Sequence, residues 1–81
     1  MFVSIEFLGR QRVITDTPSI KMPITEGTRV ADALEYVKQQ YPALDLSEAE
    51  VLIAVNQEMV SPERTLRDND TISFLPFIHG G

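Results

Sequence analysis

One stretch of this chain has the periodicity of an amphipathic helix, and segments with the periodicity of strands precede and follow it. Between Val30 and Tyr41 the apolar residues are spaced by four, three and four positions, which places them on one face of a helix. Thr28 is the predicted N-cap, and Pro42 cannot continue the helix beyond Tyr41. Because a single helix has one apolar face to bury, we expect it to pack on one face of a sheet.

The segments before the helix are predicted to be a pair of strands. Residues 2–8 and residues 20–24 each alternate between the two faces of a strand, with apolar side chains on one of them. Pro23 has no amide proton to donate, so the second segment is predicted to be an edge strand. Residues 10–18 lack this pattern and are expected to be a loose connection within a long hairpin.

The segments after the helix predict further strands. After an acidic connection over 43–50, residues 51–55 are apolar throughout, which is typical of a strand that is covered on both faces or lies at the sheet centre. Residues 56–58 are expected to turn the chain into a short returning strand that begins near Met59. Leu66 is expected to be a buried anchor between loops.

The last strand completes the expected domain. Asn69 is predicted to adopt a positive φ in a tight turn, and the strand begins at Thr71 with Ile72 and Phe74 facing inward. The pattern predicts an α+β fold, with a mixed four- to five-stranded sheet covered by one main helix. We expect residues 1–75 to form this domain and residues 76–81 to form a flexible C-terminal tail that ends in Gly-Gly.

Composition excludes several classes of protein. The absence of cysteine excludes disulfides, thiolate metal sites and a cysteine nucleophile, and a single histidine argues against a metal site of another kind. The net charge of −5 arises entirely after residue 40 and repels phosphate backbones, so no nucleic acid is expected as a partner. Charged residues interrupt every apolar run and no secretory signal is apparent, so we expect a cytoplasmic protein without a membrane span.

The final eight residues, FLPFIHGG, admit two interpretations. They are a frayed terminus, or they are the working part of the protein. Phe77 and Ile78 favour the second, because apolar side chains in a tail mark a contact site. Gly80 and Gly81 have no Cβ, so they could pass through a narrow channel and present a carboxylate inside a partner. Such a carboxylate can attack ATP to give an acyl-adenylate, which a sulfur nucleophile converts to a thiocarboxylate.

Three segments of the sequence resemble one family. They are "IEFLGRQR" (5–12), "VLIAVNQEMV" (51–60) and "LRDNDTISFLPFIHGG" (66–81). The first segment resembles the end of the family's first strand, where an aromatic residue is followed by a small residue and an arginine. The second segment resembles the family's central strand, its Val-Asn turn and the returning strand. The third is similar to a Leu-x-Asp-Gly-Asp turn, a final strand and a proline-containing Gly-Gly tail. Together they resemble the MoaD/ThiS family of ubiquitin-like sulfur carriers, most of all its molybdopterin synthase small-subunit branch.

The resemblance implies a β-grasp fold and a carrier role in molybdenum cofactor biosynthesis. Gly81 would be adenylated by an ATP-using partner of the ubiquitin E1 type (MoeB/ThiF-like) and then thiocarboxylated. The tail would insert into the large subunit of molybdopterin synthase, with Gly80 and His79 threading the channel. The chain would be a co-substrate within a two-subunit synthase, with no bound cofactor and no enzymatic activity of its own. The docking segment carried over from the family comprises Phe74, Leu75, Pro76, Phe77 and Ile78.

The chain departs from the family pattern at three positions. Asn69 replaces the usual turn glycine, Phe77 stands where a second proline is common, and His79 stands where a small residue is usual. The altered tail leaves open a carrier that serves thiazole or another sulfur pathway. It also leaves open a protein modifier joined through Gly81 to target lysines, or an interaction domain whose Gly-Gly end is accidental. The long connection after the first strand favours the molybdopterin branch.

Overall fold

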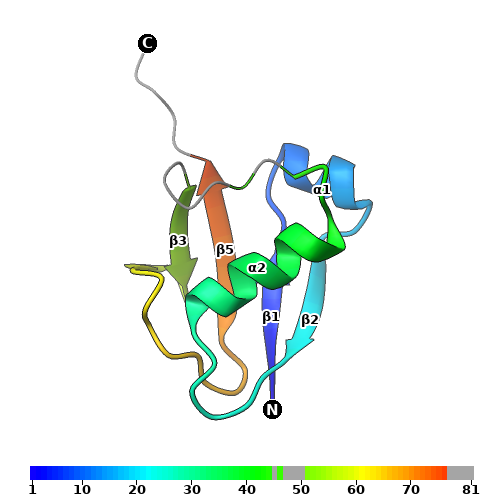
Figure 1. The fold of residues 1–81 in the computed structure, drawn as a ribbon. Helices are drawn as coiled ribbons and strands as arrows, with labels where there is room; N and C mark the ends of the chain where they lie inside the picture. Colours follow the sequence, from blue (N-terminus) through cyan, green and yellow to red (C-terminus); the bar gives the residue numbers. More distant parts are fainter. Residues whose placement is uncertain (45, 47–50, 77–81) are drawn as a thin grey trace.

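The computed structural model describes residues 1–44, 46 and 51–76, which form one mixed sheet crossed on one face by a helix (Figure 1). Its strands lie in the order β2-β1-β5-β3-β4. The predicted α+β architecture is therefore confirmed, with five strands and one main helix. Along the chain the elements are β1 (Phe2–Glu6), α1 (Arg10–Thr15), β2 (Ser19–Pro23), α2 (Val30–Gln40), β3 (Val51–Val55), β4 (Glu58–Val60) and β5 (Thr71–Pro76).

The last strand of the chain occupies the centre of the sheet. β5 is parallel to β1 on one side and antiparallel to β3 on the other. β2 pairs only with β1 and is the edge strand that Pro23 indicated. The prediction for residues 51–55 was wrong in part, because β3 lies beside the central strand and α2 covers only one of its faces. Leu52 is 42% exposed on the other face, which α2 does not cover.

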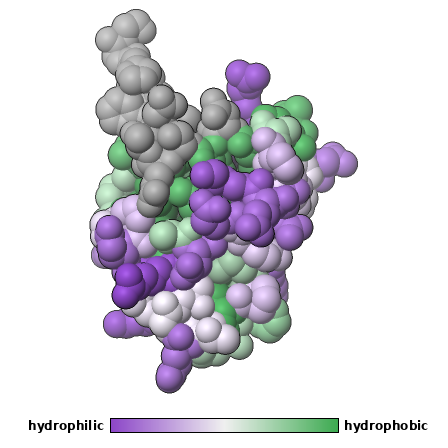
Figure 2. All heavy atoms as spheres, viewed as in Figure 1, coloured by the Kyte–Doolittle hydropathy of each residue, from purple (hydrophilic) through white to green (hydrophobic). Residues whose placement is uncertain are grey.

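Helix α2 lies over the sheet as its periodicity predicts. Its N-cap is Arg29 and not Thr28, whose hydroxyl accepts the Thr25 N–H instead, at 3.1 Å. The Asp32 carboxylate accepts the Arg29 N–H at 2.8 Å, which satisfies one of the donors that a helix start leaves free. Figure 2 shows a hydrophilic stripe along the outer side of this helix. The helix side chains buried against the sheet are those of Val30, Ala33, Leu34 and Val37.

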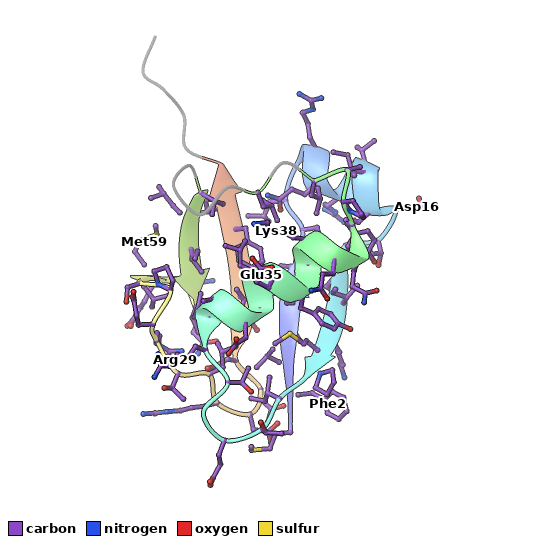
Figure 3. All side chains as sticks on the ribbon, in the orientation of Figure 1. Phe2, Asp16, Arg29, Glu35, Lys38 and Met59 are labelled. Carbon is purple, nitrogen blue, oxygen red and sulfur yellow. The ribbon has the colours of Figure 1, made fainter. Side chains whose placement is uncertain are left out.

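Glu35 and Lys38 lie on the solvent side of α2 (Figure 3). Their charged atoms are 3.5 Å apart, three residues apart along the helix. Such an exposed pair adds about 0.2–0.5 kcal/mol to helix stability, so the helix depends mainly on its buried face.

The expected loose connection over 10–18 contains a short helix. α1 begins after Gly9, which has a φ of 54°. Its C-cap is Asp16, which has a φ of 57° and donates its N–H to the Arg12 carbonyl. Gln11 and Thr15 are buried at 8% exposure each, and their spacing of four places them on one helix face. The sequence concealed this helix because its buried face is polar and its apolar Val13 is 81% exposed.

The turns and the core agree with the sequence in most places. Asn69 has a φ of 70°, as predicted, and Leu66 is buried. Ile72 and Phe74 face inward with 0% exposure. The connection over 43–50 was expected to be polar and acidic. Two of its residues, Leu44 and Leu46, are buried and contribute to the core.

Candidate functional site

The candidate site is the end of β5, because this strand leads directly into the Gly-Gly segment. β5 ends at Pro76, whose Cα lies opposite Val51 of β3. The strand thus continues one residue beyond the domain boundary expected at residue 75. Pro76 has no N–H, so it donates no hydrogen bond to a neighbouring strand at this position. Five predicted site residues lie outside the described residues, and their roles stay predictions: Phe77, Ile78, His79, Gly80 and Gly81.

Of the predicted docking residues, two side chains are described, and they face opposite sides of the sheet. Phe74 is fully buried beneath α2, so its assignment to partner docking is wrong: a core side chain cannot contact another protein. Leu75 is half-buried and lies on the uncovered face, in register with Leu52 of β3. The alternation of a strand explains the difference between the two neighbours.

Two further apolar side chains share this uncovered face. Leu52 is 42% exposed and Met59 of β4 is 56% exposed, and Met59 pairs with Ala54 of β3. We refer to Leu52, Met59 and Leu75 as the outer-face patch. Figure 3 shows Met59 at the side of the molecule where β3 and β4 lie. A shallow depression in the same region is lined by Leu52 and Met59 of the patch, by their neighbours in β3 and β4 and by the loop that follows.

The sequence contained a signal for this patch that was not used. Residues 51–55 are apolar at every position, yet a strand sends alternate side chains to opposite faces. With a single helix available to cover one face, Leu52 had to point toward solvent or toward a partner. Exposed apolar side chains that gather in this way mark contact sites.

The start of β5 is held by a network around Asp70, which is 5% exposed. Its carboxylate accepts the Arg67 N–H at 2.8 Å, the Arg64 guanidinium at 3.1 Å and the Asn56 amide at 2.9 Å. The Asn56 side chain in turn accepts the Thr71 N–H at 3.0 Å. The network therefore joins the β3–β4 turn to the first residue of β5.

The same hydrogen bonds set the acidity of Asp70. Burial acts to raise the pKa of its carboxyl, because a low-dielectric environment disfavours the charged form. The hydrogen bonds from Arg67, Asn56 and Arg64, together with the positive charge of Arg64, outweigh burial and hold the pKa below its ordinary value. The carboxylate is thus ionised and fully bonded at neutral pH.

At the other end of β5, beyond the last residue that pairs with β1, the side chain of Gln11 forms a hydrogen bond to the strand. β1 pairs with β5 as far as Glu6 opposite Ser73. Beyond that point the buried Gln11 carboxamide donates from Nε2 to the Phe74 carbonyl oxygen at 2.7 Å. Its Oε1 accepts the Leu8 N–H at 3.1 Å. The described part of β5 is therefore held close to its final residue.

Within the described ranges, no three His, Cys, Asp or Glu residues are grouped so that they could hold a metal ion. In the same part of the chain, no helix is both long and apolar enough to cross a membrane. The functional features that the structure describes are thus an anchored central strand and an apolar patch beside its end.

Comparisons with known proteins agree with this arrangement. The molybdopterin synthase sulfur carrier subunit of Mycobacterium tuberculosis is 31% identical over 80 residues, which cover 98% of this chain and 96% of that protein. Among solved structures, a putative molybdopterin converting factor, subunit 1, from Pyrococcus furiosus is 26% identical with a TM-score of 0.82, covering 96% of this chain and 99% of that one.

The small archaeal modifier protein SAMP1 of Methanosarcina acetivorans shares the ubiquitin-like β-grasp fold. It is 24% identical with a TM-score of 0.79, covering 99% of this chain and 96% of that one. The sequence also matches the ThiS family over residues 5–81, a range that includes both terminal glycines. The chain therefore belongs to the ThiS family, within the MoaD/ThiS group of ubiquitin-like sulfur carriers that its sequence predicted.

Proposed function

We propose that this protein is the sulfur-carrier subunit of a molybdopterin synthase and that the carboxylate of Gly81 carries the sulfur. The observation that supports this most is the family match, which extends through Gly81. The relative that is 31% identical over almost the whole chain bears this function in its name. It favours the molybdopterin pathway over thiazole or another sulfur acceptor.

The proposed chemistry takes place on the tail and in the active sites of partner enzymes. A carboxylate oxygen of Gly81 bonds to the α-phosphorus of ATP in an activating enzyme of the ubiquitin E1 type, and pyrophosphate leaves. A sulfide equivalent then forms a C–S bond with the acyl carbon, and AMP leaves. The large synthase subunit accepts the thiocarboxylate and uses its sulfur for the dithiolene of the pterin. In this proposal the reaction takes place in the cytoplasm.

The folded domain contributes presentation, and the bond-making steps belong to the partners. Hydrogen bonds at both ends of β5 fix the strand from which the tail starts. The outer-face patch, beside that strand, offers apolar surface for docking. In this proposal the chain is a co-substrate that binds no cofactor of its own, and Gly80 and His79 pass through the partner's channel.

Mass spectrometry of the intact protein tests this proposal. After incubation with the activating enzyme, ATP and sulfide, we expect one terminal oxygen to be replaced by sulfur. A Gly81→Ala variant should fold normally and be charged about 100-fold more slowly, because the added methyl group displaces the reacting carboxylate in its channel. If the wild-type chain stays unmodified beside an activating enzyme that charges its own carrier, the proposed function is wrong.

Co-purification and a search for covalent adducts distinguish the remaining sulfur acceptors. Stable co-purification with a thiazole synthase, and not with a large pterin-synthase subunit, would assign the carrier to the thiazole pathway. Covalent adducts with lysine side chains of other proteins in a lysate would assign it to protein modification. The molybdopterin proposal requires the chain to co-purify with a large pterin-synthase subunit and not with a thiazole synthase. It also requires the charged chain to support pterin dithiolene formation.

A further inference from the structure

Gln11 connects the two parallel strands at the point where their backbones diverge. The ladder between β1 and β5 includes a bond from the Ser4 N–H to the Asp70 carbonyl, at 2.9 Å. Parallel ladders repeat every two residues in each strand. Two repeats further on, the bond would run from the Leu8 N–H to the Phe74 carbonyl. These are the two groups that the Gln11 carboxamide bonds, one at each end.

The Gln11 carboxamide therefore bridges the two groups that the next backbone hydrogen bond of the ladder would join directly. An amide group carries the same donor and acceptor pair as a peptide unit, so Gln11 can accept from one strand and donate to the other. Its backbone cannot do this, because Gln11 belongs to α1 and its own N–H bonds to the Leu8 carbonyl at 3.0 Å. Gln11 is 8% exposed, which protects both bonds from competition with water.

This bond lies close to the base of the tail. Phe74 is two residues before Pro76, and Pro76 has no N–H with which to bond this edge of β5. On the opposite edge, β3 remains in register with β5 up to Pro76. Without the bond from Gln11, the last residues of β5 would be held from one side only, and a buried carbonyl would lose its donor.

We propose that Gln11 is a positioning residue for sulfur transfer, because it fixes the end of β5, the strand that leads into the Gly-Gly segment. This inference rests on the proposed carrier function. When the strand end frays, additional residues must be ordered each time the tail enters a partner, and this ordering weakens productive binding. The chemistry at Gly81 is unchanged once the tail is in place.

The test compares Gln11→Met with Thr15→Val in charging assays with the activating enzyme. Methionine keeps the length of the side chain but neither accepts from Leu8 nor donates to Phe74. Thr15 is the matched control, because it is buried on the same face of α1 and its hydroxyl donates to the Thr17 carbonyl at 2.9 Å, away from β5. Both variants are assayed at a temperature at which circular dichroism shows them folded.

For Gln11→Met we expect the KM of the activating enzyme for the carrier to rise about tenfold, with kcat nearly unchanged. Amide hydrogen exchange should accelerate in the peptide that contains residues 72–76. For Thr15→Val we expect both readouts to match the wild type. A Gln11→Met protein that is folded and charged with the wild-type KM overturns the inference, whatever its melting temperature.

A second variant covers failure of the first to fold. Gln11→Glu retains an acceptor for the Leu8 N–H, but its carboxylate cannot donate to the Phe74 carbonyl. We expect the same rise in KM, and a wild-type KM for this variant again overturns the inference. Failure of the proposed function has a different result, since the wild-type chain itself would then remain uncharged.

Discussion

The Asp70 carboxylate is a buried charged group that accepts three hydrogen bonds, so the stability of the fold is expected to depend on its charge. It is nearly buried, and it accepts hydrogen bonds from Arg67, Arg64 and Asn56. The sequence placed it in a tight turn before the last strand, and the turn was confirmed. Its bonding could not be predicted, because Arg64 and Asn56 lie 6 and 14 residues away in the chain. Only the folded topology brings these donors to one carboxylate.

Replacing Asp70 by asparagine should destabilise the protein in a pH-dependent way. At pH 7 we expect Asp70→Asn to lower the free energy of unfolding by about 1–3 kcal/mol, because hydrogen bonds to a charged acceptor are lost. The pKa of this carboxyl is lowered in the folded state, so its contribution is complete above the unfolded value near 3.9 and is lost as the pH falls through the folded value. The free energies of unfolding of the wild type and the variant should therefore begin to converge below about pH 3.9, and they should meet once the pH is below the folded value.

Urea unfolding at several pH values measures this convergence. Asp16→Asn is the matched control, because Asp16 is exposed and has a φ of 57°, a conformation that asparagine also tolerates. We expect it to change the unfolding free energy by less than about 0.5 kcal/mol. A difference between wild type and Asp70→Asn that stays constant as the solution is acidified would contradict the role assigned to the charge.

Among the elements, the hairpin between β3 and β4 contains a strained turn. Its two loop residues, Asn56 and Gln57, have φ values of 53° and 72°, and positive values at both positions are characteristic of a type I′ turn. Asparagine suits the first position, but glutamine has no special tolerance for the second. Gln57 is exposed, so its side chain is not required by the core.

Gln57→Gly should therefore stabilise the protein. Glycine removes the steric cost of the left-handed conformation, and its greater entropy in the unfolded chain offsets part of the gain. We expect a net increase of about 0.5–1 kcal/mol in the free energy of unfolding, measured by thermal or urea denaturation. Gln57→Ala retains a Cβ and should stay near the wild type. If the alanine variant is stabilised as much as the glycine variant, strain in the turn is not the cause.

The two helices show what periodicity can predict and what it cannot. α2 follows the apolar rule, and its start at Val30 and its buried face could be read from the sequence, whereas its N-cap at Arg29 could not. α1 buries Gln11 and Thr15 and exposes Val13, so the positions of its apolar residues do not indicate which face of the helix is buried. Gln11 and Thr15 are buried because each finds backbone partners, and one of these partners, the Phe74 carbonyl bonded by Gln11, is 63 residues away in the chain.

Across the whole molecule, the architecture was more predictable than the docking surface. Alternation in the strands and one amphipathic helix were sufficient to predict a four- to five-stranded sheet covered by one helix, and the structure has five strands in the residues that it describes. The docking residues assigned by family resemblance included Phe74, which the same alternation places in the core. Leu52 was missed because the alternation of its strand was not used, and its neighbour Leu75 belongs to a strand that is distant in sequence, so only the sheet order brings Leu52 beside the end of β5.

The position of the outer-face patch leads to a prediction about partner binding. Leu52 is 42% exposed beside Leu75, so Leu52→Glu places a charge where the proposed docking surface is apolar. We expect at least a tenfold loss of affinity for the large synthase subunit in titration calorimetry, since burying an unpaired charge in an interface is costly. The variant should remain folded, because α2 covers the opposite face of the sheet.

Phe2→Glu provides the control for a general effect of charge on this sheet. Phe2 is 53% exposed at the start of β1. Since β1 and β5 are parallel, it lies beside the beginning of β5 and away from Pro76 (Figure 3). We expect this variant to bind the large subunit as the wild type does. Equal losses for Phe2→Glu and Leu52→Glu would mean that binding senses total charge, and wild-type affinity for Leu52→Glu would exclude the patch from the interface.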